Sequence, residues 1–137
     1  MLFFLTLTQQ CNLRCLYCGS SEDTDIEDLL PHPRNITFDF ESIKKLAKID
    51  TSKDPEGLII CFYGGEPLLK KNLIEKTFQL LPKETKYCLQ TNGTLMKFIK
   101  PELINRMDTI LISVDGDEKV TDANRGKGTW KKVFVFI

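Results

Sequence analysis

The sequence has no excess of charge of either sign, a single histidine, and no apolar run long enough to cross a bilayer. Its 19 Lys and Arg residues balance 19 Asp and Glu residues, so nothing indicates a nucleic-acid partner or an anionic membrane. The longest apolar runs, residues 2–5 and 58–63, fall far short of the ~20 residues of a transmembrane helix. The N-terminus lacks the basic start of a signal peptide. We therefore expect a cytoplasmic protein.

The composition is that of an ordinary globular domain. Hydrophobic residues make up 42% of the chain and charged residues 28%, which excludes a disordered chain or a collagen-like repeat. A length of 137 residues suits about one domain with a buried core. Residues 20–35 are acidic, polar and contain proline, and we expect them to form one long loop that includes His32.

Five cysteines are present, and Cys11, Cys15 and Cys18 lie within eight residues. An odd number of cysteines without a secretory signal argues against a disulfide framework. Clustered thiolates are soft ligands that suit zinc or an iron–sulfur cluster. A structural zinc site needs a fourth ligand, which His32 or Cys61 could supply, whereas an iron–sulfur cluster held by three cysteines leaves one iron open. The spacing favours the iron–sulfur cluster, with zinc as the alternative.

Apolar segments of strand character alternate with segments of helical period. The expected strands are residues 2–8, 57–63, 86–90 and 109–114. The expected helices are residues 40–49 (capped by Asp39 or Thr37), a second that starts at Leu68 or Asn72 and ends at Leu81, residues 101–106, and one that starts near Thr129. This alternation predicts an α/β fold with a parallel sheet. A closed barrel takes about 250 residues, so the chain supplies about four βα units, the N-terminal portion of a TIM-like barrel.

The unusual motifs follow the expected strands, each at the point where a strand ends. They are the three clustered cysteines, Gly64-Gly65-Glu66-Pro67, Thr91-Asn92-Gly93 and Asp115-Gly116. Ligands bind at this edge of parallel α/β folds, because the loops there converge. The arrangement predicts an enzyme. Cys61 and Cys88, by contrast, lie inside expected strands and are interpreted as small core residues.

The cysteine motif, with Tyr17 directly before its third cysteine, resembles the signature of radical S-adenosylmethionine (SAM) enzymes. The segment 64–67 resembles that family's loop for the methionine amino group. Residues 113–116 and 122–130 resemble the sulfatase-maturing and peptide-modifying (SPASM-type) subgroup. The resemblance runs from the first expected strand to about Trp130.

This resemblance implies that Cys11, Cys15 and Cys18 each bind one iron of a 4Fe-4S cluster, whose fourth iron takes SAM. Reduction then cleaves SAM to methionine and a 5′-deoxyadenosyl radical, which abstracts a hydrogen from the substrate. A peptide or protein substrate and an electron donor of the flavodoxin or ferredoxin type are the implied partners.

The resemblance also implies roles around SAM. Glu66 and the carbonyl groups of Gly64 and Gly65 would accept hydrogen bonds from the amino group, while Pro67 stiffens the loop. We expect Tyr17 to lie against the adenine. The remaining candidates, for the ribose or the methionine carboxylate, are Asn92, Ser113 and Arg125, the last of these from a polar loop.

The family's barrel continues beyond four units. We therefore interpret residues 1–137 as a truncated core with the cluster loop at residues 9–20, lacking the C-terminal barrel half and any auxiliary-cluster module. The all-apolar residues 133–137 favour strand structure, where the fourth helix should show polar positions. An inactive or split-gene remnant remains an alternative, as does a non-enzymatic zinc-binding module.

Overall fold

The computed structural model describes residues 1–18, 36 and 38–136. The expected loop 20–35, with His32, and the alternative cap Thr37 lie outside these described residues. The strands are β1 (Leu2–Thr8), β2 (Ile59–Gly64), β3 (Lys86–Thr91) and β4 (Thr109–Ile112). The helices are α1 (Phe40–Leu46), α2 (Lys71–Leu80), α3 (Pro101–Asn105), α4 (Glu118–Arg125) and α5 (Thr129–Phe134), with 3-10 turns η2 (Pro67–Lys70) and η3 (Met96–Phe98).

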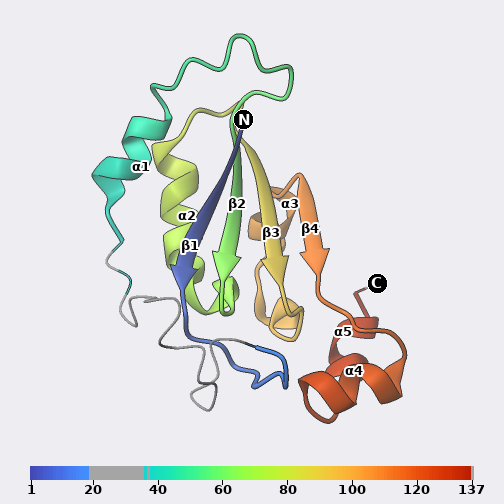
Figure 1. Cartoon of the computed structure of the whole chain (residues 1–137). Helices are drawn as coiled ribbons and strands as arrows, with labels where there is room; N and C mark the ends of the chain where they lie inside the picture. Colours follow the sequence, from blue (N-terminus) through green and yellow to red (C-terminus); the bar gives the residue numbers. More distant parts are fainter. Residues whose placement is uncertain (19–35, 37, 137) are drawn as a thin grey trace.

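The four strands form one parallel sheet in the order β1-β2-β3-β4 (Figure 1). Each strand therefore lies beside the next strand of the sequence. Right-handed crossovers between such neighbours place the connecting helices on one face of the sheet, as in a βα barrel. The predicted α/β fold, a partial TIM-like barrel of about four βα units, is confirmed.

Local signals in the sequence explain where the helices begin. Asp39 caps α1, because its carboxylate accepts a hydrogen bond from the Glu41 amide at 2.9 Å. The second expected helix is divided into η2, which starts at Pro67, and α2, which ends before Pro82. Pro101 occupies the first turn of α3, where its missing N–H costs nothing. No helix in the part of the chain that the structure describes is long and apolar enough to cross a membrane.

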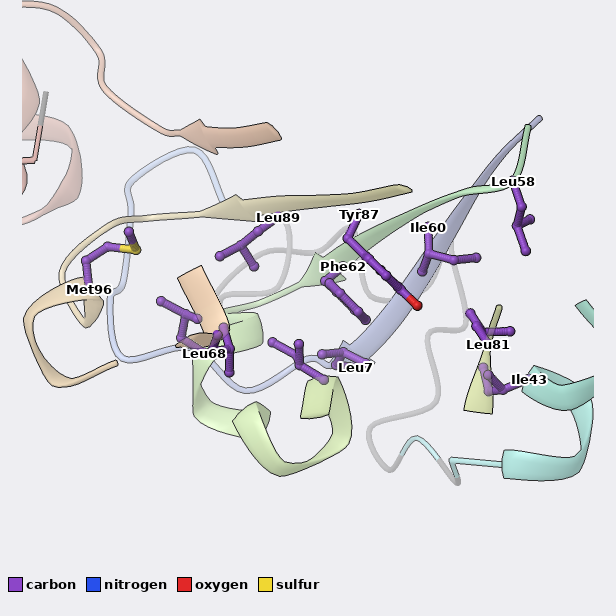
Figure 2. Packing of buried hydrophobic residues seen from close by; sticks show 12 residues of the cluster. Leu7, Ile43, Leu58, Ile60, Phe62, Leu68, Leu81, Tyr87, Leu89 and Met96 are labelled. Atoms are coloured by element: carbon purple, nitrogen blue, oxygen red, sulfur yellow. The ribbon is translucent and has the colours of Figure 1, made fainter. Parts of the chain in front are cut away.

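The core lies between the sheet and the helices. Phe62 and Tyr87, neighbours on β2 and β3, stack with their ring centroids 5.7 Å apart, and the Phe78 ring of α2 meets Tyr87 edge-on at 4.6 Å. Figure 2 shows Phe62, Tyr87 and Leu89 pointing to the same side of the sheet. Burying these large apolar side chains supplies the main driving force for the fold.

The opposite face of the sheet carries apolar side chains that are partly exposed. Phe4 is 60% exposed and Leu111 49% exposed, and Phe4 meets the Tyr63 ring edge-on at 5.8 Å. Cys61 and Cys88 lie in register on β2 and β3, and both are buried. Their interpretation as small core residues is consistent with this burial.

Two expectations near the end of the chain are wrong. The apolar residues from 133 onward do not begin a strand, because Val133 lies inside α5 and is buried. Its methyl groups lie against Gly93 in the loop after β3, so tertiary packing overrides its β propensity. Helix α4 is missing from the prediction, and Arg125 lies in its last turn rather than in a loop. Only Thr121 of α4 is buried, and the helix contains just two apolar residues, Val120 and Ala123.

Candidate functional site

The loop after β2 packs against the loop that carries the cysteines. The Gly65 amide donates to the Thr8 carbonyl at 2.8 Å, and the Glu66 amide donates to the Gln10 carbonyl at 2.9 Å. A Cβ atom on Gly65 would lie 2.4 Å from the Gln10 carbonyl oxygen. Glycine is therefore required here because two backbone segments of the protein itself approach each other. Gly64 approaches Thr8 in the same way, with φ at +133°.

Glu66 joins the loops after β2 and β3 from inside the protein. Its side chain is 0% exposed. Oε1 accepts hydrogen bonds from the Leu68 amide at 3.0 Å and the Thr91 hydroxyl at 2.8 Å, and Oε2 accepts one from the Asn92 amide at 2.9 Å. Burial raises the pKa of the Glu66 carboxyl, and these three hydrogen bonds oppose that rise. Pro67, also buried, follows as the first residue of η2.

A second set of hydrogen bonds connects the loop after β3 to the cysteine loop. The Asn92 side-chain amide donates to Asn12 Oδ1 at 2.9 Å and to Cys11 Sγ at 3.6 Å. Asn12 in turn donates to the Thr94 hydroxyl at 2.8 Å. The Leu13 amide also donates to Cys11 Sγ, at 3.4 Å. Cys11 therefore lies at the junction of two loops, with its sulfur already accepting two hydrogen bonds.

The three clustered cysteines are all partly exposed and lie close enough to interact. Burial raises the pKa of the Cys15 thiol, Arg125 lowers it, and Cys11 and Cys18 raise it further. Within residues 1–18, 36 and 38–136, no three His, Cys, Asp or Glu side chains converge so as to hold a single metal ion. In a 4Fe-4S cluster each cysteine binds a different iron, so the sulfurs need not meet at one point. The spread of the thiols is therefore compatible with such a cluster.

The far end of the cysteine loop is attached to α4. The Tyr17 hydroxyl donates to Asp115 Oδ1 at 2.8 Å, and Arg125 forms an ion pair with the same oxygen at 2.7 Å. The Leu16 amide donates to the Asn124 carbonyl at 2.9 Å, and Figure 1 shows the loop after β1 running past the strand ends toward α4. Partial burial and the bond to Asp115 raise the pKa of Tyr17 to about 12. Arg125 holds the pKa of the Asp115 carboxyl below its usual range.

The site residues thus fall into two connected groups. Cys11, Gly64, Gly65, Glu66 and Asn92 belong to one network of loop contacts at the ends of β1, β2 and β3. Tyr17 and Arg125 belong to a second group, centred on Asp115 and close to Cys15. Ser113 follows β4, where its backbone amide donates to the Thr91 carbonyl at 3.0 Å.

Sequence reasoning gave no role to Asp115, Thr91 or Thr94. Asp115 was visible only as part of the motif after the fourth strand, and its partner Tyr17 lies 98 residues earlier. Thr91 and Thr94 flank Asn92, and both are buried with their hydroxyl groups in hydrogen bonds. A polar residue at the end of a buried strand is a signal for a buried hydrogen bond between loops, but the sequence does not identify the partner of that bond.

Replacing Asp115 with alanine tests whether the second group holds the cysteine loop. The side chains of Arg125 and Asp115 are only 11% and 16% exposed, so we expect a loss of about 1.5–3 kcal/mol in the free energy of unfolding. Urea unfolding followed by circular dichroism measures it. The matched control is Glu118→Ala, which removes the exposed pair with Lys131 and should cost at most about 1 kcal/mol. Equal losses for the two variants would contradict a structural role for Asp115.

Comparisons with known proteins show what the chain as a whole is similar to. The model of the radical SAM superfamily matches residues 5–137. Over 97% of its length the chain is 30% identical to molybdenum cofactor biosynthesis protein 1 of Drosophila melanogaster, and over 81% it is 31% identical to a GTP 3′,8-cyclase of Clostridium perfringens. A solved structure of native anSMEcpe with bound AdoMet and Cp18Cys peptide is similar over 98% of the chain, with 26% identity and a TM-score of 0.67. The chain covers 23%, 33% and 38% of these three proteins.

Proposed function

The chain belongs to the radical SAM superfamily, and from that premise we propose that Cys11, Cys15 and Cys18 hold a 4Fe-4S cluster that binds SAM for radical chemistry on a peptide or protein. Members of this superfamily bind such a cluster and SAM. When bound, these groups supply the reductive cleavage of SAM to a radical that abstracts hydrogen. The observation that carries the proposal is the loop of three interacting thiols, fixed at both ends by hydrogen bonds.

The loop after β2 would receive the amino group of SAM. We propose that the carbonyl groups of Gly64 and Gly65 accept hydrogen bonds from the ammonium, and that Glu66 positions them from behind. The burial of Glu66 and its three protein donors support a positioning role. Pro67 keeps the exit of the loop rigid, because its ring fixes the backbone φ angle.

The second group would face the adenosine and carboxylate ends of SAM. Tyr17, which is 57% exposed, offers a flat apolar surface for the adenine while its hydroxyl is held by Asp115. Arg125 would attract the methionine carboxylate with the part of its guanidinium group that Asp115 leaves available, and Ser113 offers a hydroxyl at the end of β4. An electron donor of the flavodoxin or ferredoxin type would reduce the cluster.

We also propose that residues 1–137 form the first half of a barrel core, with the cluster loop at residues 9–20. The open apolar face with Phe4, Tyr63 and Leu111 supports this, because it corresponds to the interior of a closed βα barrel. Further barrel strands would cover this face, and the substrate would bind among them.

A peptide substrate is supported by the likeness to anSMEcpe solved with its Cp18Cys peptide. The GTP 3′,8-cyclase relatives favour a nucleotide instead. The two are distinguished by supplying the remaining barrel strands, fused or in trans, and incubating the reduced, reconstituted protein with SAM and either the Cp18Cys peptide or GTP. We expect the peptide to raise the formation of 5′-deoxyadenosine and GTP to leave it unchanged. Stimulation by GTP and not by the peptide would contradict a peptide substrate.

Exchanging Glu66 for glutamine tests the loop that would bind SAM. Donors approach both carboxylate oxygens, so the NH₂ group of glutamine faces a donor in either orientation. We expect the free energy of unfolding to fall by about 1–3 kcal/mol. Binding of SAM should weaken by about tenfold or more, since a tenfold loss corresponds to 1.4 kcal/mol.

Titration of SAM against the electron paramagnetic resonance signal of the reduced cluster measures that affinity. Iron content should stay unchanged in Glu66→Gln, because the three thiols are intact. The control is Glu102→Gln, on an exposed position of α3, which should change neither stability nor affinity. An unaltered affinity in Glu66→Gln would remove Glu66 from the proposed SAM site.

A further inference from the structure

The side-chain amide of Asn92 is held in one orientation by its neighbours. Its oxygen accepts hydrogen bonds from the Thr94 amide at 3.0 Å and from the Thr94 hydroxyl at 2.7 Å. Its nitrogen donates to Asn12 Oδ1 at 2.9 Å and faces Cys11 Sγ at 3.6 Å. A flipped amide would place its NH₂ group against the Thr94 amide and its oxygen against Asn12 Oδ1. The network therefore directs an N–H group at the Cys11 sulfur.

Burial strengthens the hydrogen bond from Asn92 to Cys11 Sγ. Asn92 is only 7% exposed, so water competes little for the N–H group or for the side of the sulfur that it faces. The Leu13 amide approaches the same sulfur at 3.4 Å. Hydrogen bonds to a ligand sulfur stabilise negative charge on it, and they belong to the factors that set the reduction potential of an iron–sulfur cluster.

We infer that Asn92 is a positioning residue that raises the reduction potential of the cluster through its hydrogen bond to Cys11 Sγ, and that it does not contact SAM. This inference rests on the proposed function, because it requires a cluster on Cys11. The physical reason is the sign of the charge change. One added electron makes the ligand sulfurs more negative, so an N–H donor stabilises the reduced cluster more than the oxidised one.

The test is an anaerobic redox titration of the reconstituted chain, with the reduced cluster monitored by electron paramagnetic resonance. Asn92→Leu removes the donor at similar volume. At a fixed solution potential, its ratio of reduced to oxidised cluster should fall by about threefold to tenfold, a tenfold change being about 59 mV for one electron. Asn92→Asp keeps the oxygen that Thr94 binds and replaces the donor with an oxygen. It should lower the ratio further, because it also adds negative charge.

The matched control is Thr94→Val, which removes the hydroxyl but keeps the Thr94 amide, so the Asn92 oxygen retains one donor and the nitrogen still faces the sulfur. At the same fixed solution potential, we expect its ratio of reduced to oxidised cluster to stay within twofold of the wild-type ratio. Equal shifts in Asn92→Leu and Thr94→Val, or no shift in Asn92→Leu and Asn92→Asp, would overturn the inference while leaving the proposed function intact. Failure of the wild-type chain to assemble a cluster would instead overturn the proposed function. SAM affinity should be unchanged in Asn92→Asp, and a loss of it would assign Asn92 to the SAM site.

Discussion

Replacing Cys11, Cys15 or Cys18 individually with alanine should abolish cluster assembly, leaving a chain that retains well below the expected four irons after anaerobic reconstitution. In the proposed cluster each thiolate would hold its own iron, so losing any one of them would leave a second iron without a protein ligand. The other described cysteines cannot substitute, because Cys61 and Cys88 lie inside β2 and β3 and are buried. Iron and acid-labile sulfide per chain, together with the visible absorption of the cluster, measure this effect.

The controls for this experiment come from the same chain. Cys61→Ala and Cys88→Ala remove thiols of the same chemistry from buried positions on β2 and β3. They should keep the full iron content and lose only about 1 kcal/mol of stability, the cost of a small cavity. Loss of the cluster in Cys61→Ala together with its retention in Cys15→Ala would show that the ligand set is wrong.

Exchanging Gly65 for alanine should have the second large effect. Its new Cβ would lie 2.4 Å from the Gln10 carbonyl oxygen and 2.5 Å from that of Gln9. Both are backbone atoms of the cysteine loop, which must move to make room. We expect a loss of about 1–3 kcal/mol from overpacking. Cluster loading should fall as well, because the same shift displaces Cys11.

Urea unfolding and iron content measure the two consequences separately. Gly57→Ala is the matched control, because Gly57 has φ at +67° with nothing within 4 Å of an added Cβ. Its backbone strain should cost about 1–2 kcal/mol, while iron content stays at the wild-type level. Full iron loading in Gly65→Ala would contradict the view that contact between the two loops positions the cysteines.

The elements of the fold were predictable because they depend on local patterns. The apolar segment 2–8 forms β1 with the predicted bounds, and Asp39 caps α1. Short, polar α4 was missed because its formation depends on the cap at Asp117 and on contacts with α5 rather than on an apolar period. The Asp117 cap and the glycine at position 126 were signals that could have indicated it.

The site was predictable in its position but not in its connections. The ends of the strands indicated where the loops meet, and the cysteine spacing indicated the type of ligand. The bond from Asn92 to Cys11 spans 81 residues of sequence, and nothing local to either residue specifies it. Gly64 and Gly65 were expected to present their carbonyl groups to a ligand, yet the close approach that the structure describes is to Thr8, Gln9 and Gln10 of the chain itself. Such pairings depend on the tertiary structure.

Mössbauer spectroscopy of the chain reconstituted with ⁵⁷Fe, with and without SAM, tests the central claim most directly. Three cysteines on a four-iron cluster leave one iron without a protein thiolate. We expect SAM to change the signal of about one quarter of the iron and to leave the other three quarters unchanged. Spectra that are identical with and without SAM, or a chain that takes up stoichiometric zinc and no iron, would contradict it.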